Sequence, residues 1–379
     1  MKTPDILKTS LFIVLTLFLY SCKEKYPLPA SLADKSYLVV EGFIDNGNDT
    51  TRIGLSRTSP LEEGRNPVME SGANVWIEGE ENEFFPLTEM EPGIYKGGPF
   101  TLNENSRYRI RIETMNGKSY SSGFEEVKKT PAIDSVSWTR EPGGVQIDVN
   151  THDPKNESKY YAWQFEETWE FYSAYYSSYE YVNGQMVSRM NGADIFRCWQ
   201  SNVSRSIIIG SSAKLNEDII YRAPLIYIPD DSWKISSRYS VLVKQRCLPK
   251  NGYEYLEKMK KNSESLGSIF DPMPTTDRGN ITCDTDPSEM VIGYVYVSSV
   301  EEKRIFITRG DVGRWRYMMQ CPIDTIENNP EELKAYFGSG GYLAIIGLGM
   351  GTISHYTASS SYCMDCTQRG TNVKPDFWP

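Results

Sequence analysis

Short runs of alternating apolar and polar side chains fill the first third of the chain. Residues 37–44 (YLVVEGFI) and 107–113 (RYRIRIE) are such runs, and Asn-Gly pairs at 46–47 and 116–117 follow them. A period of two is typical of half-buried strands, and Asn-Gly between two strands is typical of a hairpin. About seven short strands without a helical period are typical of an immunoglobulin-like fold. We therefore predict an immunoglobulin-like β-sandwich over residues 36–130.

The pattern restarts after Thr130-Pro131, which marks a predicted domain boundary. Strand patterns resume over 144–150 and 219–228, whereas 253–265 carries an apolar face at helical spacing with lysines near its end. We predict that residues 131–379 form a larger β-rich domain with this helix inserted and a cysteine-containing C-terminal tail. The predicted fold class is mainly β, with two β-sandwich-like (immunoglobulin-like) domains.

An apolar run near the N-terminus ends abruptly at a cysteine. Lysines precede residues 11–19 (LFIVLTLFL), and a serine stands directly before Cys22. The run is too short to span a bilayer, and this ending is typical of a lipoprotein signal peptide. We predict a signal peptide over 1–21, acylation of Cys22 and a tether over 22–35. Each buried methylene contributes about 0.8 kcal/mol, so two or three acyl chains anchor the protein in membrane lipid. An ordinary secretory signal is the alternative.

The charge balance is acidic, with 40 Lys and Arg against 50 Asp and Glu and a net charge of −10. Nucleic-acid binding needs a basic face that neutralises phosphates, so no nucleic-acid partner is predicted. No second apolar run approaches the roughly 18 residues of a membrane helix. Residues 342–350 come nearest and are predicted to form a buried strand, and 330–337 a short helix with proline in its first turn.

Six cysteines remain once Cys22 is acylated, and an even number in an exported protein predicts disulfides. They are Cys198, Cys247, Cys283, Cys321, Cys363 and Cys366. We predict that Cys198 pairs with Cys247, and that Cys283 and Cys321 pair with the two cysteines at 363 and 366. The spacing of those last two also matches a redox motif, and four late cysteines could hold zinc. Their position in a tail of an exported protein favours structural disulfides.

Residues that carry catalytic chemistry are scarce. The two histidines, His152 and His355, stand in unrelated contexts, so neither a metal site nor a Ser-His-Asp relay is predicted. A glycosidase needs only two carboxylates, and the 50 acidic residues leave that alternative open although no motif singles out a pair. We predict a non-enzymatic protein without a cofactor. A secreted hydrolase using a carboxylate pair is the alternative.

Aromatic residues concentrate between residues 160 and 181. Those of the first half fall at strand spacing and are predicted to supply core on one face. The second half mixes tyrosines with small residues, a composition typical of binding surfaces. These tyrosines are Tyr172, Tyr175, Tyr176, Tyr179 and Tyr181. We predict that they bind a peptide or glycan ligand or a partner. The alternative is a hairpin whose tyrosines pack against the sheet.

Several motifs together resemble a known family. They are residues 38–43 (LVVEGF), 239–245 (YSVLVKQ), 265–272 (SLGSIFDP), 363–366 (CMDC) and 370–378 (GTNVKPDFW). The chain resembles the Bacteroidetes-type lipoproteins catalogued as domain of unknown function 4249. The resemblance implies a cell-envelope lipoprotein of a group often associated with TonB-dependent outer-membrane transporters. It carries over no catalytic residue.

The sequence and the resemblance together predict a lipoprotein held in the outer membrane through acylated Cys22, facing the exterior. We expect a non-enzymatic binding or accessory component of a TonB-dependent nutrient uptake system. The transporter and a peptide or glycan ligand are the expected partners. A purely structural envelope protein that binds only its transporter is the alternative.

Overall fold

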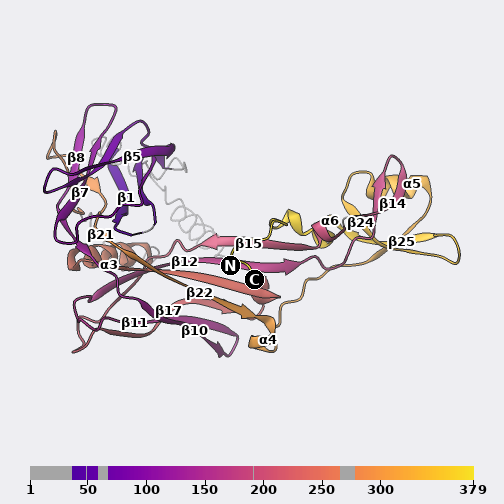
Figure 1. Cartoon of the computed structure of the whole chain (residues 1–379). Helices are drawn as coiled ribbons and strands as arrows, with labels where there is room; N and C mark the ends of the chain where they lie inside the picture. Colours follow the sequence, from indigo (N-terminus) through magenta and orange to yellow (C-terminus); the bar gives the residue numbers. More distant parts are fainter. Residues whose placement is uncertain (1–35, 48, 59–66, 191, 265–277) are drawn as a thin grey trace, which may run out of the picture.

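A computed structural model gives the fold. It describes residues 36–47, 49–58, 67–190, 192–264 and 278–379. The fold is mainly β, as predicted, and consists of a ring of strands, a two-sheet module and a distal lobe (Figure 1). The predicted signal peptide, Cys22 and the tether lie outside the described residues. Within the described ranges, no helix combines the length and apolar character needed to cross a membrane.

The ring closes through eight strands in the order β7-β4-β5-β6-β2-β1-β21-β9, with β9 pairing back onto β7. Its strands are β1 (Leu38–Asp45), β2 (Thr51–Arg57), β4 (Asn74–Gly79), β5 (Phe84–Glu91), β6 (Ile94–Gly97), β7 (Arg107–Glu113), β9 (Glu125–Lys128) and β21 (Val297–Ser298). Strands β3 (Val68–Met69), β8 (Ser119–Ser122), β19 (Ile281–Cys283) and β20 (Val291–Ile292) pair onto them. Alternate side chains such as Ile77, Ile110 and Ile112 are buried inside the ring.

A segment far along the chain completes the ring. β19, β20 and β21 come from residues 281–298, although the sequence places that region in the second domain. Gly293, with a φ of +145°, lies so close to β1 that a Cβ would stand 2.2 Å from the carbonyl oxygen of Val40. Glycine is therefore required at this junction. The immunoglobulin-like sandwich predicted for 36–130 is not confirmed, because these strands form a ring that β19 to β21 complete. Those three strands are two or three residues long, too short to show a period in the sequence.

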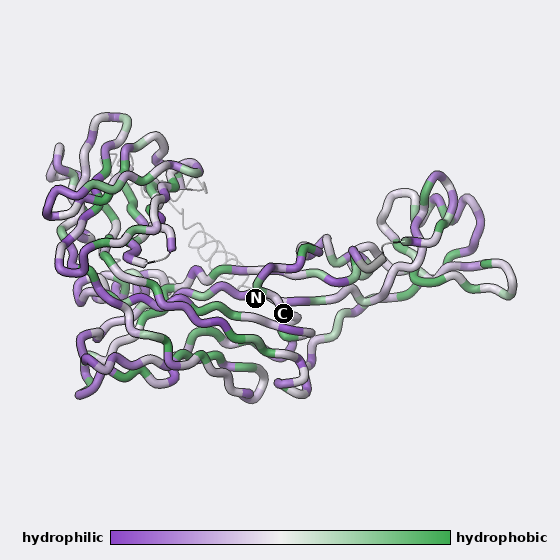
Figure 2. Tube along the Cα trace, viewed as in Figure 1, coloured by the Kyte–Doolittle hydropathy of each residue, from purple (hydrophilic) through white to green (hydrophobic). Residues whose placement is uncertain are grey.

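Two facing sheets form the central module and share one core. One sheet holds β10 (Ile133–Glu141), β11 (Gly144–His152) and β17 (Ile219–Pro229); the other holds β12 (Tyr160–Tyr172), β15 (Arg197–Val203), β16 (Ile208–Ser211), β18 (Arg238–Cys247) and β22 (Val300–Thr308). Short helices η2 (Gly192–Ile195), η3 (Trp233–Ile235) and α4 (Arg309–Val312) lie at the end of the module nearer the lobe. Val145 and Ile147 of one sheet belong to the same buried cluster as Trp163 and Phe165 of the other, as the alternation of 160–171 predicts. Hydrophobic stretches follow these strands in Figure 2.

Helix α3 (Lys250–Glu264) lies where the ring meets the two-sheet module (Figure 1). It corresponds to the helix predicted over 253–265 but begins three residues earlier. The last predicted position, 265, lies outside the described residues. Its Tyr253 packs on Tyr160 of β12 with ring centroids 5.0 Å apart, and its Tyr255 lies 5.8 Å from Tyr294. The helix therefore contacts both the module and the segment that completes the ring.

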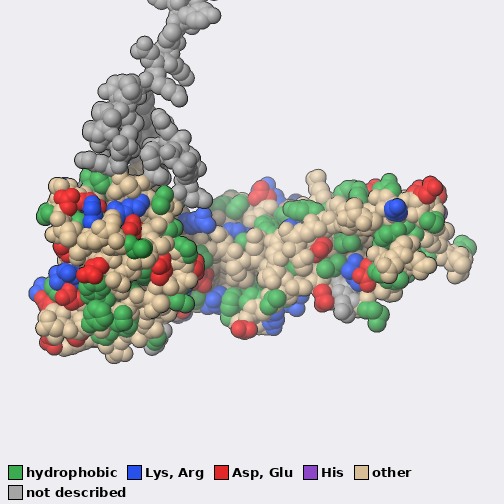
Figure 3. Space-filling view, turned by 90° about the horizontal axis from the view of Figure 1, so that it is seen from above, with side chains coloured by type: hydrophobic (Ala, Val, Ile, Leu, Met, Phe, Trp, Pro, Cys, Tyr) green, Lys and Arg blue, Asp and Glu red, His purple; other side chains and the backbone are tan. Residues whose placement is uncertain are grey.

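The distal lobe projects from the end of the two-sheet module that lies opposite the ring (Figures 1 and 3). Its sheet has the order β14-β13-β24-β25-β23, built from β13 (Tyr179–Val182), β14 (Gln185–Ser188), β23 (Asp324–Glu327), β24 (Tyr342–Leu348) and β25 (His355–Ser360). Helix α5 (Pro330–Phe337) buries Leu333 and Phe337 against this sheet, and Asn329 caps it. After α6 (Ser361–Met364) and η4 (Cys366–Gln368) the chain returns to the two-sheet module, where Trp378 packs on Phe306.

Candidate functional site

Two disulfides brace the junction between the lobe and the two-sheet module. Cys321 is bonded to Cys363 and Cys198 to Cys366, with Cα–Cα distances of 5.9 and 5.7 Å. Cys321 precedes β23 and Cys363 follows β25, so the first bond closes the base of the lobe. The second ties the returning C-terminal segment to β15. Covalent bonds at both places restrict how far the lobe can move relative to the module.

The predicted pairing of Cys198 with Cys247 is wrong. Strand register places Cys247 beside Tyr161 and Cys198 beside Phe171, ten residues apart along β12. At 3.3 Å per residue this is about 33 Å, far beyond the span of a disulfide. The predicted bond from Cys283 to the tail is also wrong, because Cys283 lies in the core of the ring. Cys247 and Cys283 are buried and form no disulfide within the described part of the chain.

The five predicted tyrosines divide into two groups. Tyr179 stacks edge-on against Tyr356 at 5.2 Å, Tyr181 packs against the lobe core, and the Tyr175 hydroxyl donates to the carbonyl oxygen of Cys321 at 2.8 Å. These three support the lobe and its junction. Tyr172 and Tyr176 flank Phe196, with ring centroids 5.3 and 5.5 Å away, and are 40% and 44% exposed. The structure therefore does not bring all five tyrosines together on one surface.

One face of the lobe sheet is open. Helix α5 covers the face that carries Tyr356 and Ala358. The opposite face presents exposed apolar side chains from three strands. They are Val182, Val187, Ile346 and Leu348. A register shift in β24 between Ala344 and Ile346 turns these last residues outward, so the buried strand predicted over 342–350 is buried on one face only. We call these four residues the open lobe face.

A cleft of about 640 Å³ separates the ring from the two-sheet module. Phe43 of β1, Arg52 of β2 and Lys96 of β6 form one wall, and they are direct cross-strand neighbours in the register. Lys244 and Arg246 of β18 line the other wall. Arg205 lines the cleft from the loop before β16. We call this the cationic cleft. It could not be predicted from the sequence, since its walls come from strands far apart in the chain.

The cations of this cleft differ in the partners that they contact. Lys244 lies within 3.4 Å of Asp49 and 3.1 Å of both Glu166 and Glu302. Burial alone would lower the pKa of the Lys244 ammonium, but hydrogen bonds to the two glutamates and their charges raise it well above its usual range. Arg246 lies over the Phe43 ring at 4.5 Å, and its buried Nε has no hydrogen-bond partner among the described residues.

The buried glutamates of β12 offer no free carboxylate pair. Glu167 accepts hydrogen bonds from Asn202 at 2.9 Å, Lys234 at 2.5 Å and Tyr239 at 3.0 Å. Glu170 is ion-paired with Arg197 in the same way. Each carboxylate is thus neutralised by a cation from its own module, as in structural ion pairs. His152 lies in the two-sheet module and His355 in the lobe. No group of metal-ligating side chains occurs within the described ranges.

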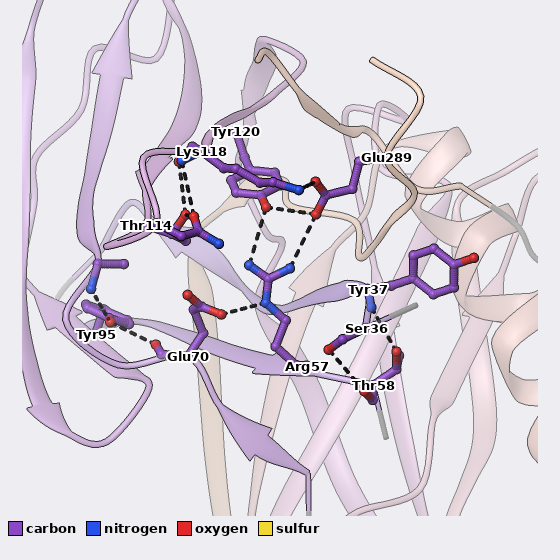
Figure 4. A network of polar contacts seen from close by, with 12 residues as sticks. Ser36, Tyr37, Arg57, Thr58, Glu70, Tyr95, Thr114, Lys118, Tyr120 and Glu289 are labelled. Atoms are coloured by element: carbon purple, nitrogen blue, oxygen red, sulfur yellow. Dashed lines mark hydrogen bonds and ion pairs between the residues drawn. The ribbon is translucent and has the colours of Figure 1, made fainter. Parts of the chain in front are cut away.

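A polar network fastens the returning segment to the ring (Figure 4). Arg57 contacts Glu70 at 2.5 Å and Glu289 at 3.3 Å, while Tyr120 donates to Glu289 at 2.9 Å and Lys118 is ion-paired with it. Burial alone would raise the pKa of Glu289, but the hydrogen bonds from Lys118 and Tyr120, with the nearby positive charges, hold it below its usual range. The network stabilises ring closure and presents no unpaired nucleophile.

Comparison with known proteins gives a family without an assigned activity. Residues 23–304 match the family described as "Domain of unknown function (DUF4249)". The chain belongs to this family. The match ends at residue 304, so it does not extend the resemblance to the motifs at 363–378, and β23 to β25 of this DUF4249 protein lie outside it. No curated protein matches the chain.

Among solved structures, a DUF4785 family protein from Legionella pneumophila is 9% identical to this chain. The similarity covers 54% of this chain and 51% of that protein, with a TM-score of 0.18. The chain therefore spans about half the length of that protein. A likeness at this level carries no argument about function.

Proposed function

We propose that this protein is a lipid-anchored accessory component of the outer membrane that docks a TonB-dependent transporter through its open lobe face. The observation that carries the proposal is the lobe itself: a small two-layer unit, held away from the rest of the chain and braced by two disulfides, with exposed apolar side chains among polar ones on its uncovered side. For the fold, we retain the β-sandwich-like proposal for the two-sheet module alone.

The open lobe face suits a protein partner. A sheet normally covers its apolar face with another layer, and here Ile346 and Leu348 remain 47% and 41% exposed. Ile346 and Leu348 are neighbours on one face of β24, and exposed apolar side chains that lie together on a stable domain mark an interaction surface. The braced base reduces the conformational freedom lost on binding, which favours affinity. Acylation of Cys22 would place the whole chain at the membrane that contains the transporter.

A hydrolase is less well supported, because the described buried glutamates each have a cationic partner. A purely structural envelope role requires the same transporter contact but no ligand. Binding of a soluble ligand would separate these two roles.

Docking is tested by copurification from the native membrane. Ile346→Glu and Leu348→Glu each place a charge on the open lobe face, where neither side chain supports the core. Tyr221→Glu is the matched control, since Tyr221 of the two-sheet module is 79% exposed. We expect the tagged wild type and the control to retain a porin-sized membrane protein and both lobe variants to lose it. Equal recovery with all variants contradicts docking through the lobe.

Anchoring is tested separately. Cys22→Ser should abolish labelling by a palmitate analogue and release the chain from the envelope, because the acyl chains supply the anchor. Continued labelling of this variant, or unchanged envelope association, contradicts the proposed anchor.

A further inference from the structure

We propose that the cationic cleft binds a small organic molecule carrying at least two carboxylates. This site lies between the ring and the two-sheet module, at the opposite end of the molecule from the lobe (Figure 1). The inference goes beyond the docking function, because it assigns a ligand class to a different surface.

The charge of the cleft opposes that of the chain. The whole protein carries a net charge of −10. Five cationic side chains nevertheless line this one cleft, against a single lining carboxylate, Asp49. Asp49, Glu166 and Glu302 all pair with Lys244, so the excess positive charge of the cleft comes from Arg52, Lys96, Arg205 and Arg246. A concave site lined by one sign of charge concentrates ligands of the opposite sign.

Two of the three arginines have no compensating acid among the described residues, whereas Arg246 lies near the buried Asp45 carboxylate. Arg52 and Arg205 are exposed and have no ion pair within the described ranges. Arg52 also lies directly opposite Lys96 across the β2–β6 pair, and like charges in that position destabilise a sheet. Within the described ranges Lys96 forms one ion pair, with Glu91 at 3.8 Å and on the surface. A bound carboxylate between Arg52 and Lys96 would remove this repulsion.

Arg246 supplies a more specific indication. Its guanidinium is held over Phe43, yet the buried Nε donates to no acceptor among the described residues. An arginine held in a fixed position matches a carboxylate. Arg246 therefore places a fixed guanidinium on the wall opposite Arg52, although its Nε is enclosed and does not face the cleft.

The shape of the cleft sets the size of the ligand. A volume of about 640 Å³ is that of a site for a small molecule. Trp163, Ile208 and Leu256 add apolar surface between the charged walls. A ligand that reaches both walls carries separated carboxylates joined by a less polar part. Short acidic peptides and uronic-acid oligosaccharides share this chemistry.

Calorimetry on the detergent-solubilised full-length protein tests the proposal with two acidic probes, the peptide Glu-Phe-Glu and trigalacturonate. Gln-Phe-Gln amide and maltotriose are their uncharged counterparts. We expect at least one acidic probe to bind, its counterpart to bind at least tenfold more weakly, and 0.5 M NaCl to weaken the acidic probe. The probe that binds identifies the source of the carboxylates.

Arg205→Glu should weaken the acidic probe at least tenfold, and so should Arg52→Gln, because each removes an uncompensated cation from an exposed position. Lys214→Glu is the matched control, an exposed residue outside the cleft lining. Absence of binding by both acidic probes at millimolar concentration overturns the proposal, as does an equal loss in Lys214→Glu. Copurification with the lobe variants tests docking, and calorimetry with the cleft variants tests ligand binding. Either proposal can therefore fail while the other holds.

Discussion

Asp45 is a buried acid whose replacement should stabilise the protein at neutral pH. It ends β1 and is 1% exposed, facing the two-sheet module. One carboxylate oxygen accepts a hydrogen bond from the Asp49 backbone at 3.1 Å, and the other has no partner among the described residues. Burial, with a smaller contribution from the Asp49 charge, raises its pKa from 3.8 to about 6, although the Asp49 hydrogen bond and Arg246 oppose this.

The sign of the pH dependence follows from the raised pKa. Above pH 6 the carboxylate is ionised in both the folded and the unfolded chain, and only the folded state bears the cost of burying the charge. The shift of about 2 units corresponds to about 3 kcal/mol. The cost falls as pH drops through 6 and is nearly gone at pH 4, where the folded-state carboxyl is neutral and the unfolded one is about half protonated. Asp45→Asn keeps an amide oxygen for the Asp49 N–H but leaves a buried amide, so we expect a gain of about 1–3 kcal/mol at pH 8.

Urea unfolding followed by tryptophan fluorescence measures this difference at pH 8 and pH 4. We expect Asp45→Asn to unfold at higher urea than wild type at pH 8 and to lose that advantage at pH 4. Asp376→Asn, at an exposed acid, should change stability by less than about 0.5 kcal/mol at either pH. A variant less stable than wild type at pH 8, or a gain independent of pH, refutes the reasoning.

Three further variants probe the ring and the lobe. Glu289→Gln should lower stability by about 2 kcal/mol at pH 7 in urea unfolding, and the loss should shrink as pH falls through the depressed pKa of this carboxyl; a constant loss contradicts the assigned network. Cys363→Ser removes the disulfide to Cys321, 42 residues away, so limited proteolysis should cut the lobe faster. Without this bond the unfolded chain gains conformational entropy, which should lower stability by about 4 kcal/mol. Unchanged cleavage contradicts this. Tyr175→Phe should cost about 1 kcal/mol in thermal unfolding and leave copurification unchanged, whereas loss of the partner would indicate direct contact.

Elements long enough to show a clear pattern could be predicted from the sequence. The alternation over residues 160–171 predicts the core face of β12, and proline in the first turn predicts α5. The ring could not be predicted in the same way. Its closure depends on β19 to β21, which span two or three residues each and pair with strands more than 150 residues away.

The candidate sites depend even more on tertiary structure. Disulfide partners are fixed by strand register, which places Cys247 and Cys198 at opposite ends of β12. The cationic cleft joins residues 43–52, 96 and 205–246, and none of these segments is notably basic by itself. The tyrosine composition predicted one binding surface, but composition does not distinguish Tyr179 in a core from Tyr176 on a surface.

Photo-crosslinking in living cells tests the central claim most directly. A benzophenone side chain at position 348 would stand on the open lobe face, and one at position 221 would stand on the two-sheet module. The account predicts a strong crosslink from position 348 to one integral outer-membrane protein and none to that protein from position 221. Crosslinks from position 221 alone, or none from position 348, would contradict the proposal that the lobe is the docking element.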